Sequence, residues 1–152
     1  MKKICKFLAA FVILLNANMA FSQTKEEHHN TLTAHHEKAK EHAKAITSGA
    51  SNTKETHVKN ATEATKSLEE AKKAHENLKK SIPEKHKAAA KPHHDAIDKH
   101  HAEATKHAAA LNDELKKPSH DDAKVKEHAK NLHESMDKAE KEHKALKEKT
   151  SK

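Results

Sequence analysis

Apolar residues recur every three or four positions along most of this chain, from about residue 25 to residue 149, with lysine, glutamate and threonine between them. That spacing matches the period of the α-helix, and no stretch shows the alternation of a β-strand. Short runs that contain glycine, proline or serine interrupt the pattern near residues 48–52, 81–84 and 117–121. The pattern therefore predicts four helices, over about 25–47, 53–80, 83–116 and 119–149.

Particular residues are expected to start and stop these helices. Gly49 follows the first helix, where a left-handed C-cap is common. Ser81, with Glu84 three residues later, matches a capping box for the third helix. Ser119 is expected to cap the fourth helix. Pro92 is expected to kink the third helix or to mark its first turn, because an interior proline removes a backbone hydrogen bond.

Residues 1–22 do not share the helical pattern. A basic start, Met1–Lys6, precedes an unbroken apolar run over residues 7–15, and Ala20-Phe21-Ser22 is a small-x-small cleavage pattern. A run of this length is too short to span a bilayer. We therefore expect a cleavable signal peptide with Gln23 as the first mature residue, or cleavage after Ala20 as the alternative. A periplasmic or secreted location and no membrane insertion after cleavage follow from it.

The composition after residue 22 limits what the chain can do. It contains no aromatic residue, no cysteine and no arginine, and its large aliphatic side chains are few. A core of this kind is thin, so a metal, a partner or self-association is expected to supply part of the stability. Without thiols, any metal site must use histidine and carboxylate ligands.

Charge and motifs exclude two classes of function. The net charge is +7 with histidine neutral, and lysine and acidic residues are mixed along the chain. Nucleic-acid partners usually select clustered basic residues, arginine and stacking aromatics, so none is expected. The sequence shows no nucleophile–base pair, no glycine-rich phosphate loop and no paired catalytic carboxylates. We therefore do not expect an enzyme.

Histidines form a ladder that occurs twice. Residues 28–42 read HHNTLTAHHEKAKEH and residues 93–107 read HHDAIDKHHAEATKH, at a constant offset of 65. The second and fourth predicted helices also match each other, at an offset of 68. These matches indicate a duplicated helical hairpin, residues 23–82 and 83–152, packed as one all-α, up-down four-helix bundle with coiled-coil-like seams.

A heptad assignment places many histidines in the apolar seam. The first histidine of each pair is expected in the seam, and the second of each pair (His29, His36, His94 and His101) at its edge. The preferred metal ligands at the open end of the bundle are His28, His75, His93 and His143. The second choices lie toward the loops and in the middle: His42, His57, His107, His35 and His100.

The leading functional hypothesis is a His-rich helical protein that binds or buffers transition-metal ions, with Zn²⁺, Cu²⁺ or Ni²⁺ suited to imidazole ligands. The alternative is a structural or stress-protective helical protein without a ligand. Its composition, rich in alanine, lysine, glutamate and threonine, is similar to that of late-embryogenesis-abundant proteins, although the histidines depart from it. Seam histidines would make either protein responsive to pH.

Overall fold

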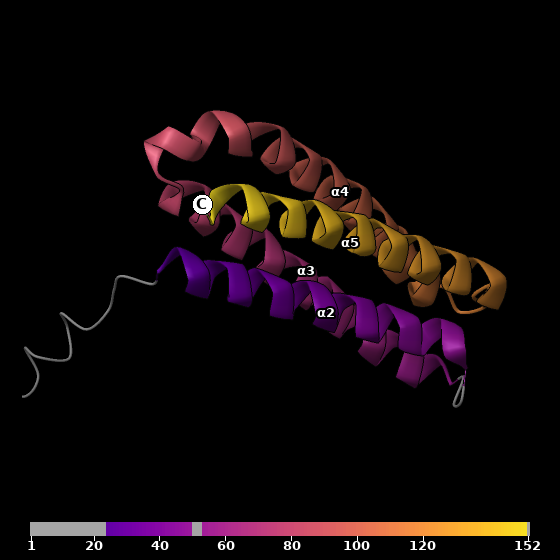
Figure 1. Ribbon diagram of the computed structural model, residues 1–152. Helices are drawn as coiled ribbons and strands as arrows, with labels where there is room; N and C mark the ends of the chain where they lie inside the picture. The colour runs from indigo at the N-terminus through magenta and orange to yellow at the C-terminus, as the bar shows by residue number, and fades with distance from the viewer. Residues whose placement is uncertain (1–23, 50–52, 152) are drawn as a thin grey trace, which may run out of the picture.

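A computed structural model describes residues 24–49 and 53–151 of the chain, and it is helical nearly throughout (Figure 1). Its helices are α2 (Lys25–Ser48), α3 (Lys54–Ser81), α4 (Glu84–Lys116) and α5 (Asp122–Thr150). No strand occurs in these ranges. All four predicted helices are confirmed, with bounds shifted by three residues at most. The predicted signal peptide lies outside the described residues.

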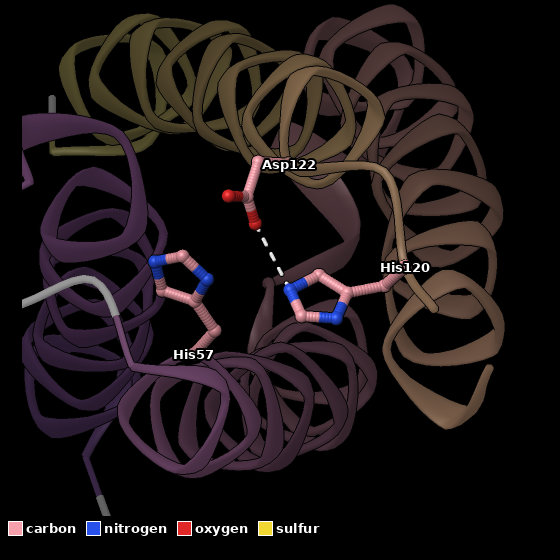
Figure 2. A group of neighbouring side chains, drawn as sticks. All are labelled: His57, His120 and Asp122. Atoms are coloured by element: carbon pink, nitrogen blue, oxygen red, sulfur yellow. Dashed lines mark ion pairs between the residues drawn. The ribbon is translucent and has the colours of Figure 1, made fainter. Parts of the chain in front are cut away.

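The helices form a four-membered bundle. Each packs on the next along the chain, and α5 closes the arrangement against α2. Short connections make neighbouring helices antiparallel, and the view along the bundle in Figure 2 shows the four around a shared core. No helix in the described part of the chain is both long and apolar enough to cross a membrane.

The core is a seam of small and medium aliphatic residues. Each helix buries a residue at alternating intervals of three and four, which is the spacing of a bundle seam. The largest fully buried aliphatic side chains are Leu32, Ile46, Leu68, Leu78, Ile97, Leu111, Leu132, Met136 and Leu146. Alanine fills most other seam positions, and histidine fills the rest.

The seam was predicted correctly for α3 and α5, and so was the aliphatic row of α2 and α4 that contains Leu32 and Ile97. The histidine row of α2 and α4 is displaced by one residue from the prediction. The buried histidines of α2 are His29 and His36, whereas His28, His35 and His42 are half-buried. The same rotation in α4 buries the second histidine of each pair. The observed register is preferred because it buries Ala43 in place of His42, and Ala108 in place of His107.

Helix ends confirm some predicted caps and correct others. Gly49 is the left-handed C-cap of α2, with φ 64°. Ser81 does not cap α4; its hydroxyl donates to the carbonyl of Leu78 at 2.9 Å. Asp121 caps α5 instead of Ser119, because its carboxylate accepts from two backbone N–H groups of the first turn. Pro92 lies inside α4, which continues through it.

Candidate metal centre

Seven histidines are buried among the described residues, and six of them lie together in the core in place of aliphatic side chains. They come from all four helices and are at most 9% exposed. The six are His29 and His36 on α2, His75 on α3, His94 and His101 on α4, and His143 on α5. Histidine is not usually buried to this extent without a partner, so their contacts decide what they can do.

The imidazole rings contact one another in three close pairs. The nitrogen–nitrogen distance is 2.7 Å in the His29–His143 pair. It is 2.9 Å between His36 and His101, and 2.8 Å between His75 and His94. Edge contacts join the pairs, with centroids 5.9 Å apart for His36 and His143 and 5.7 Å for His75 and His101. The six rings therefore form one continuous cluster.

The cluster is nearly symmetric about its central His36–His101 pair. Residues related by the offset of 65 make matching contacts. His29 of α2 contacts His143 of α5, and the equivalent His94 of α4 contacts His75 of α3. One position breaks the match. Asp98 places Oδ1 3.1 Å from Nδ1 of His75, whereas the corresponding residue in α2 is Thr33, whose hydroxyl donates to the backbone of its own helix.

Burial keeps these rings neutral. Loss of solvent around the imidazolium is the largest cause of the low pKa at each of the six, and neighbouring positive groups add to it. The pKa falls to about 2 at His36 and His75, to about 3 at His143, and to about 4 at His29 and His101. A neutral imidazole is the form that binds metal ions.

Several ring nitrogens in the cluster have unused hydrogen-bonding capacity. Among the described residues, Nδ1 of His36, Nδ1 of His143 and Nε2 of His94 are buried without a hydrogen-bond partner. A buried polar atom left in that state costs roughly 1–3 kcal/mol. Buried ring nitrogens without a hydrogen-bond partner are atoms that a metal ion could bind.

One part of the cluster has the donor set of a metal site. The ligand atoms of His75, His101 and Asp98 lie within 4.8 Å of one another. Asp98 is half-exposed at 47% and is also paired with Lys79 at 2.5 Å. A groove of about 770 Å³ between α3 and α4 is lined by His101 and Asp98, so this part of the core opens to solvent.

A second group of ligands lies at the loop end of the bundle (Figure 2). It consists of His57 in the first turn of α3, His120 in the α4–α5 loop and Asp122 at the start of α5. Their ligand atoms also lie within 4.8 Å of one another, and Nε2 of His120 is 2.9 Å from Oδ1 of Asp122.

The four preferred ligands predicted from sequence are only partly brought together. His75 and His143 lie in the buried cluster, as expected for residues of the α3 and α5 seams. His28 lines a shallow surface hollow with Asn77, and Nδ1 of His93 lies 2.9 Å from Glu142. Neither His28 nor His93 belongs to a ligand group found among the described residues.

The second choices are also dispersed. His57 belongs to the loop-end group. The others have polar neighbours on the bundle surface: His35 with Glu70, His100 with Glu103, His42 with Asn60, and His107 with His128. The predicted ligand set did not include His29, His36, His94, His101, Asp98, His120 or Asp122. The alanines at 43 and 108 were the signal that could have corrected the register.

Comparisons with family models, curated proteins and solved structures give no match to this chain. Function must therefore be argued from the two ligand groups and their surroundings.

Proposed function

We propose that this protein binds a divalent transition-metal ion in its core through His75, His101 and Asp98. The observation that carries the proposal is the approach of two neutral imidazoles and one carboxylate to within 4.8 Å in a cluster that has unused ring nitrogens. Two nitrogens and one oxygen suit Zn²⁺, with Cu²⁺ and Ni²⁺ as further candidates.

The distances within the cluster fit a site in which a metal ion would replace the N–H shared by two rings, with the displaced proton moving to the other nitrogen of its own ring. Paired neutral imidazoles at 2.7–2.9 Å share one N–H between them. Two nitrogens bound to tetrahedral Zn²⁺ at 2.0–2.1 Å are about 3.3 Å apart. A small separation of the rings therefore admits the ion, and Nε2 of His36, 2.9 Å from that of His101, is placed to provide a further ligand.

The two sides of the cluster favour one ion over two. The α2–α5 side has Thr33 where the α3–α4 side has Asp98. On the α2–α5 side, Lys40 of α2 forms an ion pair with Glu140 of α5. The α3–α4 side has the carboxylate and the groove. We therefore propose that the ion enters between α3 and α4 and is held on that side.

The proposal includes where the protein acts and how it arose. The signal-peptide pattern of residues 1–22 and the absence of cysteine after it support a periplasmic or secreted metal-binding or metal-buffering protein, rather than an enzyme. The matching offsets of 65 and 68 support an origin by duplication of a helical hairpin.

Zinc titration of the purified chain tests the core site. Competition with a chelating dye measures the affinity, and thermal unfolding measures the gain in stability. Asp98→Asn should weaken binding about 10–100-fold, and His101→Ala at least as much. The matched control is Thr33→Asn, at the equivalent position without a carboxylate, which should bind as the wild type does. At 100 times the dissociation constant, zinc should stabilise the wild type by about 2.7 kcal/mol.

Two outcomes would contradict the core site. One is equal zinc affinity in the wild type and in both the Asp98 and His101 variants. The other is unchanged helicity and unchanged melting temperature of the wild type with micromolar Zn²⁺, Cu²⁺ or Ni²⁺. The second result would favour the alternative of a helical structural protein without a ligand.

A further inference from the structure

The loop end of the bundle gathers three metal-ligating side chains from separate elements, and this group is independent of the buried cluster. We propose that His57, His120 and Asp122 form a second site for a divalent transition-metal ion. In Figure 2 the imidazole of His120 points to Asp122, and His57 lies opposite them across the end of the core.

The donor set and its exposure indicate an open site. Two imidazole nitrogens and one carboxylate oxygen are the ligands that Zn²⁺ accepts when a fourth position remains for water or an exchangeable ligand. His57 is buried at 1% exposure, whereas the side chain of Asp122 is 64% exposed. The free coordination position therefore faces solvent at the end of the bundle.

The backbone that carries His120 and Asp122 is fixed by its own hydrogen bonds. Glu114, which is only 6% exposed, accepts from the backbone N–H of Asp121 at 2.9 Å and from Lys117 at 2.6 Å. Asp121 in turn caps α5. A loop tied in this way holds its ligands in place before an ion arrives, which lowers the entropy lost on binding.

A contact between the two loop regions fixes the third ligand relative to the others. Lys54, at the start of α3, donates to the carbonyl of Lys117 at 2.7 Å. His57 lies one turn further along α3, on the buried face. An ion at this site would therefore cross-link the start of α3 to the α4–α5 loop.

The surrounding charges also permit a cation. Burial lowers the pKa of His57 and so favours the neutral ring, and His120 and Lys126 act in the same direction. Asp122 opposes them and supplies the negative charge of the site. The corresponding positions in the other hairpin, at the offset of 68, are Val125 for His57 and Lys54 for Asp122. The group therefore has no equivalent in the other hairpin.

This site is separate from the core site of the proposed function. His57 and His75 are eighteen residues apart on one continuous helix, which corresponds to about 27 Å along its axis. No single ion can bind both groups. Each site can consequently be tested while the other is intact.

The test is the zinc stoichiometry of the purified chain, measured by competition with a dye that excludes sites weaker than micromolar. The wild type should bind two ions, and His120→Ala should bind one, with affinity at the lost site reduced at least about 100-fold. Asp122→Asn should weaken the same site. The matched control is His128→Ala, another half-buried histidine near this end, which should still bind two ions.

Hydrogen exchange gives a second readout. Zinc should slow exchange in residues 117–124 of the wild type and of a His101→Ala variant, but not of the His120 variant. Two ions bound by a helical His120→Ala protein would overturn this inference, as would a single ion whose binding only His101→Ala removes. A single ion lost in His120→Ala and retained in His101→Ala would support this site and overturn the core site. No zinc bound by the wild type would overturn both.

Discussion

A neutral imidazole has one N–H donor and one acceptor nitrogen, so each buried ring in this core needs two partners. His143 uses Nε2 in its contact with His29, while its Nδ1 has no hydrogen-bond partner among the described residues. The proton shared by the pair also couples the tautomers of the two rings, since one nitrogen must donate and the other accept. Losing one member therefore leaves the other ring with an additional unsatisfied atom in the core.

Replacement of His29 and His143 by leucine, singly and together, tests this dependence. Each single substitution should lower the free energy of unfolding by about 1–3 kcal/mol, because it leaves one buried ring unpaired. The double substitution should cost at least about 1 kcal/mol less than the sum, since it removes both polar groups. Urea unfolding at pH 7.5 with a chelator present measures all three.

The control for this cycle combines His29→Leu with His57→Leu, since His57 lies toward the other end of the bundle and separated sites are expected to be additive. Additive costs for His29 and His143 would show that their 2.7 Å contact contributes no coupling to stability.

At the scale of helices, most of the fold could be predicted from the sequence. The four helices, the Gly49 cap and the seams of α3 and α5 follow from apolar spacing and turn residues. The aliphatic row of α2 and α4 followed as well, but their histidine row did not, because adjacent histidines made two rows one residue apart look equivalent. Counting the buried alanines at 43 and 108 decides between them.

The two ligand groups were harder to predict than the helices. Asp98 reaches His75 of the neighbouring helix α3 from an exposed face of α4. Its spacing of three residues from His101 puts both side chains on one face of α4, but no spacing within α4 shows that His75 of α3 faces them. His120 lies in a loop whose position depends on the buried carboxylate of Glu114. Contacts of this kind depend on how helices rotate and on how loops fold back, which a periodic pattern does not specify.

Pro92 provides a test at the same scale. The helix α4 runs through it, so the carbonyl four residues earlier lacks its helical N–H partner. Pro92 is exposed, and the buried seam of α4 begins only at Ala90. Pro92→Ala should therefore raise the free energy of unfolding by up to about 3 kcal/mol without changing the core.

Hydrogen exchange in residues 85–92 should also become slower in the Pro92→Ala protein. The control is Lys91→Ala, which removes only an exposed ion pair with Asp95 and should change stability by less than about 0.5 kcal/mol. Equal stability of the Pro92→Ala protein and the wild type would show that the first turns of α4 unfold independently of the bundle.

At the scale of the whole molecule, the bundle has a polar centre within a thin apolar core. Six neutral imidazoles stand where a more stable bundle would have leucine, so folding depends on keeping them uncharged. Charged groups act on the cluster from all four helices: Lys25, Glu26 and Lys40 on α2, Lys72, Glu76 and Lys79 on α3, Asp95 and Asp98 on α4, and Glu140 and Lys147 on α5. Stability should therefore respond to protons as well as to metal.

The metal-free protein should lose stability as the pH falls below about 6.5. The folded pKa of each cluster histidine lies below its unfolded value, so the unfolded chain takes up protons first and is favoured. The loss continues to about pH 4 for His29 and His101, and further for His36 and His75. Each ring removes up to about 1.4 kcal/mol per pH unit. Circular dichroism should show cooperative loss of helix between about pH 6 and 4.

Carboxylates must be separated from histidines in this experiment. Lysine contacts lower the pKa of Asp137 and Glu114, so these groups also lose stabilising interactions on acidification, but only below their ordinary values of 3.8 and 4.5. The interval from pH 6.5 to 4.5 therefore reports mainly on histidine.

A variant with His36 and His101 both replaced by leucine should show a shallower loss of stability in this interval. Zinc should move the wild-type midpoint to lower pH, since bound metal competes with protons for the same nitrogens. Unchanged helicity and an unchanged melting temperature at pH 5 would mean that the imidazoles take up protons without cost, which is incompatible with their burial in the core.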